Sequence, residues 1–202
     1  MSKKIDYIIS ELEDQYLMDD DSLRPWIIGF SGGKDSTALL QLVWYALKKI
    51  PRELRNRKVY VICNDTLVEN PVITEYVYGV LKKIQQASVE QSLPIEVQKT
   101  IPKLEDTFWV NIIGRGYPVP NNAFRWCTDK MKIKPTSRFI IEQVAENGEA
   151  IILLGTRSAE SANRAKSIKK HAIKGKRLTK HPNHPGTFVY SPIKDLMLEE
   201  VW

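Results

Sequence analysis

Short apolar runs alternate with longer segments of helical spacing along this chain, and this alternation restricts the fold more than any other feature of the sequence. The runs 26–30, 58–63 and 150–155 read as buried strands, and 95–99 reads as a further strand. Strands that alternate with helices predict right-handed crossovers and a parallel sheet. We therefore expect an α/β fold, in which a twisted parallel sheet carries helices on both faces.

Helices are expected between these strands and before the first of them. The apolar spacing predicts an amphipathic helix packed outside the sheet over 5–17, and further helices over 37–50, 71–91, 104–113, 135–146 and from Ser158 onward. The length of 202 residues suits one domain. We expect that domain at 25–202, after a helical segment at 1–24. The last residues, 191–202, read as a turn and the beginning of a helix, so we expect the domain to be truncated there.

Composition excludes several classes of protein. No apolar run approaches the roughly 20 residues of a membrane span, and the N-terminus lacks the apolar stretch of a secretory signal. We therefore expect a cytoplasmic protein without membrane contact. The two cysteines, Cys63 and Cys127, are too few for a disulfide framework or a self-contained zinc or iron–sulfur site. Both are expected to be free thiols.

The net charge of +6 is concentrated in the stretch 164–181, which holds eight Lys or Arg residues and no acid. Such a stretch can be a solvated loop, but its field also attracts phosphates or a nucleic-acid backbone, and we favour the phosphate interpretation. The residues expected to contact a nucleic acid are Lys132, Lys169, Lys170, Lys174, Lys176 and Arg177.

A glycine-bearing loop lies where the first predicted strand passes into a helix. Its six residues are all candidates for nucleotide binding: Ser31, Gly32, Gly33, Lys34, Asp35 and Ser36. The two glycines let the backbone curl so that successive N–H groups face an anion, and the helix N-terminus adds partial positive charge. Asp35 is a poor phosphate ligand, so it is expected to hold Mg²⁺ or to brace the loop. The competing interpretation is a plain turn capped by Asp35 or Ser36.

Two further polar loops follow predicted strands, and ligands of parallel sheets bind beyond the carboxyl ends of the strands. The candidates for nucleotide binding in these loops are Asp65, Thr66, Gly155, Arg157 and Arg164. The carboxylate of Asp65 can bind Mg²⁺ or a nucleotide hydroxyl, and guanidinium groups suit phosphates. Arg164 could instead pair with Glu160, four residues earlier on a helix face. We expect the three loops to meet at one edge of the sheet.

Cys127 lies in a basic segment, Arg125-Trp-Cys-Thr-Asp-Lys-Met-Lys-Ile-Lys-Pro135. Neighbouring cations favour the thiolate and would make Cys127 nucleophilic. A buried or merely tolerated thiol beside a phosphate-binding loop is an equally good interpretation. With Lys34, Asp35 and Arg157, Cys127 completes the set of candidate catalytic residues.

The loop 31–36 differs from the Gly-x-x-x-x-Gly-Lys-Ser/Thr signature of kinases and GTPases. It resembles the PP-loop of the ATP pyrophosphatases, which have the adenine nucleotide alpha hydrolase-like fold. Gly155-Thr-Arg-x-x-Glu-Ser-x-x-Arg164 and Ser191-Pro-Ile-x-Asp195 resemble the PAPS-reductase and sulfate-adenylyltransferase branch. This resemblance implies that the loop holds the pyrophosphate part of ATP while a nucleophile attacks the α-phosphorus, with Asp35 or Asp65 near Mg²⁺.

The pattern Arg-Trp-Cys-Thr-x-x-x-Lys-x-x-Pro at 125–135, together with 37–46 and the loop 114–124, most resembles the DndC-type proteins of bacterial DNA phosphorothioation, which are related to the SspD type. The resemblance implies that ATP adenylylates a DNA phosphate before sulfur attacks it. It also implies DNA, a cysteine desulfurase and other Dnd or Ssp proteins as partners. DndC-type proteins carry a 4Fe–4S cluster on four cysteines, and this chain has two. A cluster would therefore need sequence beyond Trp202, or this is a relative without one.

Two other functions stay open. The same nucleotide pocket would serve sulfonucleotide metabolism, as a sulfate adenylyltransferase or a PAPS reductase, although the C-terminal cysteine motif of PAPS reductases is absent. The chain could also be an assembly module that binds ATP without chemistry. Product analysis separates the three, because only the enzymes turn over their substrates.

Overall fold

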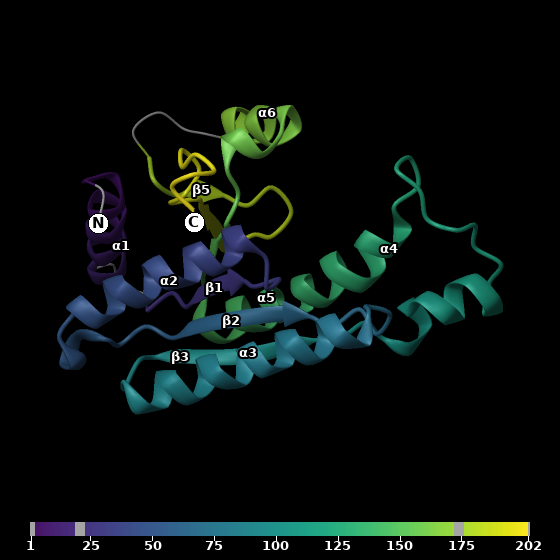
Figure 1. Cartoon of the computed structure of the whole chain (residues 1–202), viewed down its shortest axis with the longest axis horizontal. Helices are drawn as coiled ribbons and strands as arrows, with labels where there is room; N and C mark the ends of the chain where they lie inside the picture. Colours follow the sequence, from purple (N-terminus) through teal and green to yellow (C-terminus); the bar gives the residue numbers. More distant parts are fainter. Residues whose placement is uncertain (1–2, 19–22, 172–175, 202) are drawn as a thin grey trace.

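The computed structural model describes residues 3–18, 23–171 and 176–201, and a six-stranded sheet lies at its centre (Figure 1). The strand order is β3-β2-β1-β4-β6-β5. The strands are β1 (Trp26–Gly29), β2 (Val59–Asn64), β3 (Ile95–Thr100), β4 (Ala150–Leu153), β5 (Thr179–Lys180) and β6 (Thr187–Tyr190). Every neighbouring pair is parallel except β5 with β6. The expected α/β fold with a parallel sheet is confirmed.

Helices pack on both faces of this sheet. The larger apolar cluster joins α1 (Lys3–Leu17), α2 (Lys34–Lys49) and α3 (Pro71–Glu90) to one face, which carries Ile28 and Val61. The smaller cluster joins α5 (Lys134–Asn147) to the other face, which carries Ile27 and Ile62. Because successive strand residues point to opposite faces, a sheet covered on both sides needs apolar residues throughout, and this explains the apolar runs. The shorter helical elements are η1 (Arg52–Leu54), η5 (Ser158–Glu160) and α6 (Ala162–His171).

The first helix lies where the spacing of 5–17 predicts one, and it closes one side of the larger cluster. The ring of Tyr16 meets Trp26 edge-on, with ring centroids 5.4 Å apart. At the other end of the helix, the ammonium group of Lys4 lies 2.7 Å from a carboxylate oxygen of Glu200. The start of the chain is thereby fastened to its last segment. Within the described ranges, none of the helices is both long and apolar enough to span a bilayer.

Strands β5 and β6 and the end of the described chain differ from the sequence prediction. The sequence does not predict β6, because its four residues stand between Gly186 and Pro192 and read as loop; parallel pairing with β4 creates the strand. The helix expected to begin after Ser191 is replaced over 191–201 by single turns. Burial of Ile193 and Leu196 in the larger cluster takes priority over helix formation there.

Between β3 and α5 the chain leaves the sheet as a projection, here called the arm (101–133), which extends beyond the carboxyl ends of the strands in Figure 1. Instead of the helix predicted over 104–113, the arm contains the 3₁₀ turn η2 (Leu104–Asp106) and the π-helix η3 (Val110–Gly114). A short helix, α4 (Trp126–Thr128), leads into a second π-helix, η4 (Asp129–Ile133), which continues as α5. π-Helices are rare in proteins overall, and those that do occur are often found at functional sites.

The arm has a small aromatic core of its own. Trp126 stacks on Phe108, with centroids 5.6 Å apart, and meets Tyr117 edge-on at 5.4 Å. Asn111 is fully buried, and its side-chain amide donates a hydrogen bond to the carbonyl of Thr107 at 2.7 Å. Because this contact holds the wide turn at the start of η3, the arm is an ordered structure rather than an extended loop.

Candidate active site

The three predicted strand-end loops lie at the carboxyl edge of the middle of the sheet. β1 stands between β2 and β4, so the segments that follow these strands are neighbours. Gly155 shows how closely two of them approach: a Cβ atom there would lie 3.0 Å from the carbonyl oxygen of Asp35 and 3.3 Å from Cα of Ser36. A side chain at this position would displace the loop 31–36, so glycine is required.

The loop 31–36 is a tight turn that leads directly into α2. Gly32 has a φ of +72°, which glycine adopts without strain. The hydroxyl of Ser36 donates to the carbonyl of Gly33 at 2.9 Å and lies 3.2 Å from Oγ of Ser31. Gly33 is the N-cap of α2, and no side chain caps it. The leading N–H groups of the helix, with their partial positive charge, are therefore available to an anion.

Asp35 is held by Arg157, which comes from the loop after β4. Nε of Arg157 donates to Oδ1 of Asp35 at 2.7 Å, and Nη1 donates to the carbonyl of Leu196 at 3.3 Å. Arg157 is 3% exposed, so the pair lies largely out of water. Of the two roles predicted for Asp35, these contacts describe the bracing of the loop. Arg157 therefore contacts the loop through Asp35, and its contact with phosphates stays a prediction.

Asp65 follows β2 on the other side of the loop. Its Oδ1 accepts a hydrogen bond from the backbone N–H of Leu67 at 2.9 Å, and its Oδ2 accepts one from the hydroxyl of Tyr78 on α3. This second hydrogen bond is the main cause that raises the pKa of Tyr78 to about 12. Next to it, Thr66 is buried and lies within 3.3 Å of a carboxylate oxygen of Glu69. Asp65 is thereby fixed in orientation at the edge of the sheet.

Asp35 and Asp65 are also the predicted Mg²⁺ ligands. The described residues hold no group of three or more His, Cys, Asp or Glu side chains that could hold a metal ion. A Mg²⁺ ion that bridges nucleotide phosphates needs only one or two carboxylates. Asp65 fits this requirement, since each of its oxygens accepts one hydrogen bond and retains a lone pair. Asp35 fits less well, because Arg157 and Lys34 already neutralise it.

Four of the predicted phosphate contacts after β4 are exposed, namely Arg164, Lys169, Lys176 and Arg177. Arg164 is exposed, and its Nε lies 3.5 Å from Glu160, which is the helix-face pair that the sequence analysis keeps as an alternative. Nε of Arg177 lies 3.6 Å from Oε1 of Glu11, and its Nη2 lies 3.7 Å from Oδ2 of Asp14; both acids are on α1. Among the remaining candidates, Lys169 and Lys176 are exposed, Lys170 lies on α6, and Lys174 lies outside the described residues.

The two cysteines occupy different environments. Cys63 is buried in β2, and burial raises the pKa of its thiol. Cys127 is half-buried in α4. Two of the lysines expected to surround it have another partner. The ammonium groups of Lys130 and Lys134 lie 2.9 and 3.3 Å from Oδ1 of Asp106. These ammonium groups neutralise that carboxylate rather than a thiolate at Cys127.

Asp106 and Glu69 are not predicted as site residues from the sequence. Burial alone would raise the pKa of Asp106, but hydrogen bonds from Lys130 and Lys134 outweigh it and the pKa is lowered. Glu69 lies 3.7 Å from the ammonium group of Lys132, which joins the arm to the loop after β2. One signal was available: Lys130 and Lys134 are four residues apart, and like charges at this helical spacing repel unless an acid from elsewhere lies between them.

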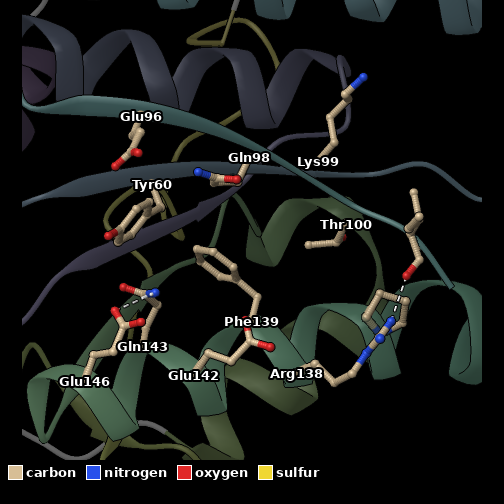
Figure 2. A pocket seen from close by; sticks show the side chains of 12 residues that line it. Tyr60, Glu96, Gln98, Lys99, Thr100, Arg138, Phe139, Glu142, Gln143 and Glu146 are labelled. Atoms are coloured by element: carbon tan, nitrogen blue, oxygen red, sulfur yellow. Dashed lines mark hydrogen bonds between the residues drawn. The ribbon is translucent and has the colours of Figure 1, made fainter. Parts of the chain in front are cut away.

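A groove of about 450 Å³ opens between β3 and α5, away from these loops (Figure 2). The rings of Tyr60 and Phe139 meet edge-on in it, with centroids 5.2 Å apart. Its lining includes no residue of the loop 31–36. It touches the site only indirectly, because the hydroxyl of Thr100 donates to Asn64, the last residue of β2, at 2.7 Å.

Comparison with known families gives a match over residues 25–202 to the phosphoadenosine phosphosulfate reductase domain. A curated relative, an uncharacterized protein of Methanocaldococcus jannaschii, is 29% identical over 148 residues, which are 73% of this chain and 26% of that protein. The chain therefore spans about a quarter of the length of this relative.

Three solved structures share the fold. The phosphoadenylyl-sulfate reductase of Candida auris matches with a TM-score of 0.53 and 14% identity, over 100% of this chain and 84% of that one. The U34-tRNA thiolase NcsA of Methanococcus maripaludis matches with a TM-score of 0.56 and 20% identity, over 97% of this chain and 62% of that one. The FMN adenylyltransferase of Candida glabrata matches with a TM-score of 0.51 and 16% identity, over 98% and 55%. At these identities the similarity concerns the fold alone.

Proposed function

The chain belongs to the phosphoadenosine phosphosulfate reductase domain family, within the PP-loop superfamily of nucleotide-using enzymes, and we propose that it cleaves ATP between the α- and β-phosphates to activate a substrate as an adenylate. One observation carries this proposal: the uncapped N-terminus of α2 follows the loop 31–36 at the centre of the carboxyl edge. Ligands of open parallel sheets bind at this edge. The FMN adenylyltransferase of Candida glabrata, which shares the fold, has been solved with FMN and an ATP analogue, and this supports a nucleotide as the ligand.

The loop 31–36 would receive the pyrophosphate part of ATP. Its backbone N–H groups and the dipole of α2 supply partial positive charge, and Lys34 adds a full one. Asp65 would hold Mg²⁺, which neutralises charge on the phosphates. Asp35 and the buried Arg157 keep the loop in its curled shape, so that its donors are already oriented when the nucleotide arrives.

We propose DNA as the activated substrate, with phosphorothioation as the reaction. The resemblance to DndC-type proteins supports this, as do the exposed Lys169 and Lys176 in the basic stretch 164–181. An adenylylated DNA phosphate would lose AMP when a sulfur nucleophile, delivered by a cysteine desulfurase system, attacks phosphorus. Of the two thiols, Cys127 is the more accessible, and we propose it as the catalytic thiol of this reaction.

An iron–sulfur cluster fits the described residues poorly. The thiolase NcsA has been solved with a [4Fe-4S] cluster, and such clusters are held by cysteine thiolates. Here Cys63 is buried in a central strand, and the described residues contain no group of three metal-ligating side chains. No step of the proposed reaction is therefore assigned to a cluster on this chain.

The first experiment is product analysis with ATP labelled at the α-phosphate, with and without DNA. We expect AMP and pyrophosphate, with stimulation by DNA. Lys34→Ala should slow this reaction by 10- to 1,000-fold, because it removes a cation from the developing phosphate charge. Lys48→Ala is the matched control, since Lys48 is an exposed lysine in the last turn of the same helix; it should leave the rate unchanged.

Each other outcome points elsewhere. ADP and orthophosphate would overturn cleavage at the α-phosphate. Tight ATP binding without pyrophosphate release, with DNA present, would favour the assembly module. The family match itself supports a second candidate, sulfonucleotide metabolism. Turnover that depends on sulfate or on phosphoadenosine phosphosulfate, and is indifferent to DNA, would establish that candidate in place of phosphorothioation.

A further inference from the structure

The arm exposes large apolar side chains although it has its own packed core. The fractions exposed are 77% for Leu104, 59% for Trp109, 77% for Ile113, 72% for Val119 and 44% for Phe124. Side chains of this size, gathered on one small ordered projection, mark a binding surface rather than a chance distribution. Since Trp126 and Phe108 fill the interior, the exposed rings are not needed to hold the arm together.

Both exposed rings adjoin the aromatic core of the arm. Phe108 contacts Trp126 and meets Trp109 edge-on, the latter with centroids 5.2 Å apart. Phe124 precedes Trp126 by two residues in the sequence. Trp109 and Phe124 are therefore anchored beside the same core while their own rings stay exposed.

Exposed cations accompany these rings. Lys103, Arg115 and Arg125 are all exposed, and no ion pair of theirs is found within the described part of the chain. Among the acids of the arm, Asp106 is shared by Lys130 and Lys134, while Glu105 and Asp129 are exposed. The surface of the arm thus combines apolar side chains with these three exposed cations and two exposed acids.

We propose that the arm binds an unpaired nucleic-acid strand, with bases stacked on Trp109 and Phe124 and phosphates near Arg115 and Arg125. Aromatic rings among cations are the arrangement that grips single strands, since every base offers a flat face and every linkage a negative charge. This inference rests on the proposed action on DNA and names the form of the substrate.

The arm is connected to the nucleotide site through η4. η4 continues from the arm, and Lys132 on it lies 3.7 Å from Glu69 in the loop after β2. Glu69 in turn accepts a hydrogen bond from Thr66, beside Asp65. A strand held on the arm would therefore be led along η4 toward the loop 31–36, where the activated phosphate must arrive.

The test is fluorescence anisotropy with labelled oligonucleotides of one sequence, single-stranded and duplex, on the full chain. Wild type should prefer the single strand, and Trp109→Ala and Phe124→Ala should each weaken that binding about tenfold while changing duplex binding little. Tyr7→Ala is the matched control, since Tyr7 is 64% exposed on α1, and it should change neither. Circular dichroism confirms that the variants are folded.

The outcomes separate this inference from the proposed function. Unchanged single-strand affinity in the double variant Trp109→Ala with Phe124→Ala overturns the arm as the binding site, but it leaves the proposals of ATP cleavage and duplex DNA binding standing. Preference of wild type for duplex, or binding of neither form, overturns it as well. A concentration-dependent dimer that Trp109→Ala dissociates would show that a second copy covers the arm, and would replace the strand as its occupant.

Discussion

Gly155 shows how a single residue can determine the shape of the nucleotide loop. Gly155→Ala places a methyl group 3.0 Å from the carbonyl oxygen of Asp35, so the loop or β4 must shift. Overpacking of this kind costs about 1–3 kcal/mol. We expect a lower unfolding free energy in urea and ATP binding weakened by more than tenfold.

The control for this substitution is another glycine of the same sheet. Gly29 closes β1, and a Cβ atom there would meet nothing within 4 Å. Gly29→Ala should therefore leave ATP binding within twofold of wild type. If both variants bind ATP equally well, the loop does not depend on the space that Gly155 provides.

At this scale the sequence reveals residue types better than partners. The loop 31–36 could be recognised because its glycines and serines are consecutive. The contact between Asp35 and Arg157 joins residues 122 positions apart, and spacing in the sequence carries no information about such a pair. The same holds for Tyr78, whose hydroxyl orients Asp65 from another element.

At the scale of elements, Asp106 pins the arm to the start of α5. Lys130 and Lys134 lower the pKa of Asp106 below its ordinary value. A carboxyl group whose pKa is lowered by folding stabilises the protein above its unfolded pKa of about 4, and this contribution is lost as the pH falls through the lower folded value. The contribution is therefore present at neutral pH and disappears in acid.

This gives a prediction in pH. Asp106→Asn should destabilise the protein at pH 7, and the difference from wild type in urea unfolding should shrink as the pH falls from about 4 toward 2. Glu105→Gln is the control, because Glu105 is the exposed neighbouring acid, and its effect should be small at every pH. A difference for Asp106→Asn that is constant across this range would mean that its charge does not pin the arm.

Elements with a regular pattern were the predictable ones. The runs that form β1, β2 and β4 are apolar throughout because both faces of the sheet are covered. The arm could not be predicted, since Asn111 and the aromatic core turn a helical pattern into π-helices. β6 depends on its neighbour β4 and has no pattern of its own long enough to identify it.

Across the whole molecule, the net charge of +6 is concentrated in the stretch 164–181, where Lys169 and Lys176 are exposed. Lys169→Glu with Lys176→Glu should weaken duplex DNA binding and reduce the slope of log affinity against log salt by about 1 or more for each lysine. Anisotropy titrations between 50 and 200 mM salt would measure both. Lys82→Glu with Lys83→Glu on α3 is the control pair, as both lysines are exposed there. An equal loss of DNA affinity in both double variants would mean that binding depends only on the total charge of the protein.

The fastening of α1 to residues 190–200 has a consequence for how this domain refolds. Lys4 and Glu200 are 196 positions apart, and the hydroxyl of Tyr190 donates to Glu11 across 179 positions. Contacts between such distant positions form late and slow the folding rate. During refolding, the seam between α1 and these residues should therefore stay open to proteases after the central strands are protected.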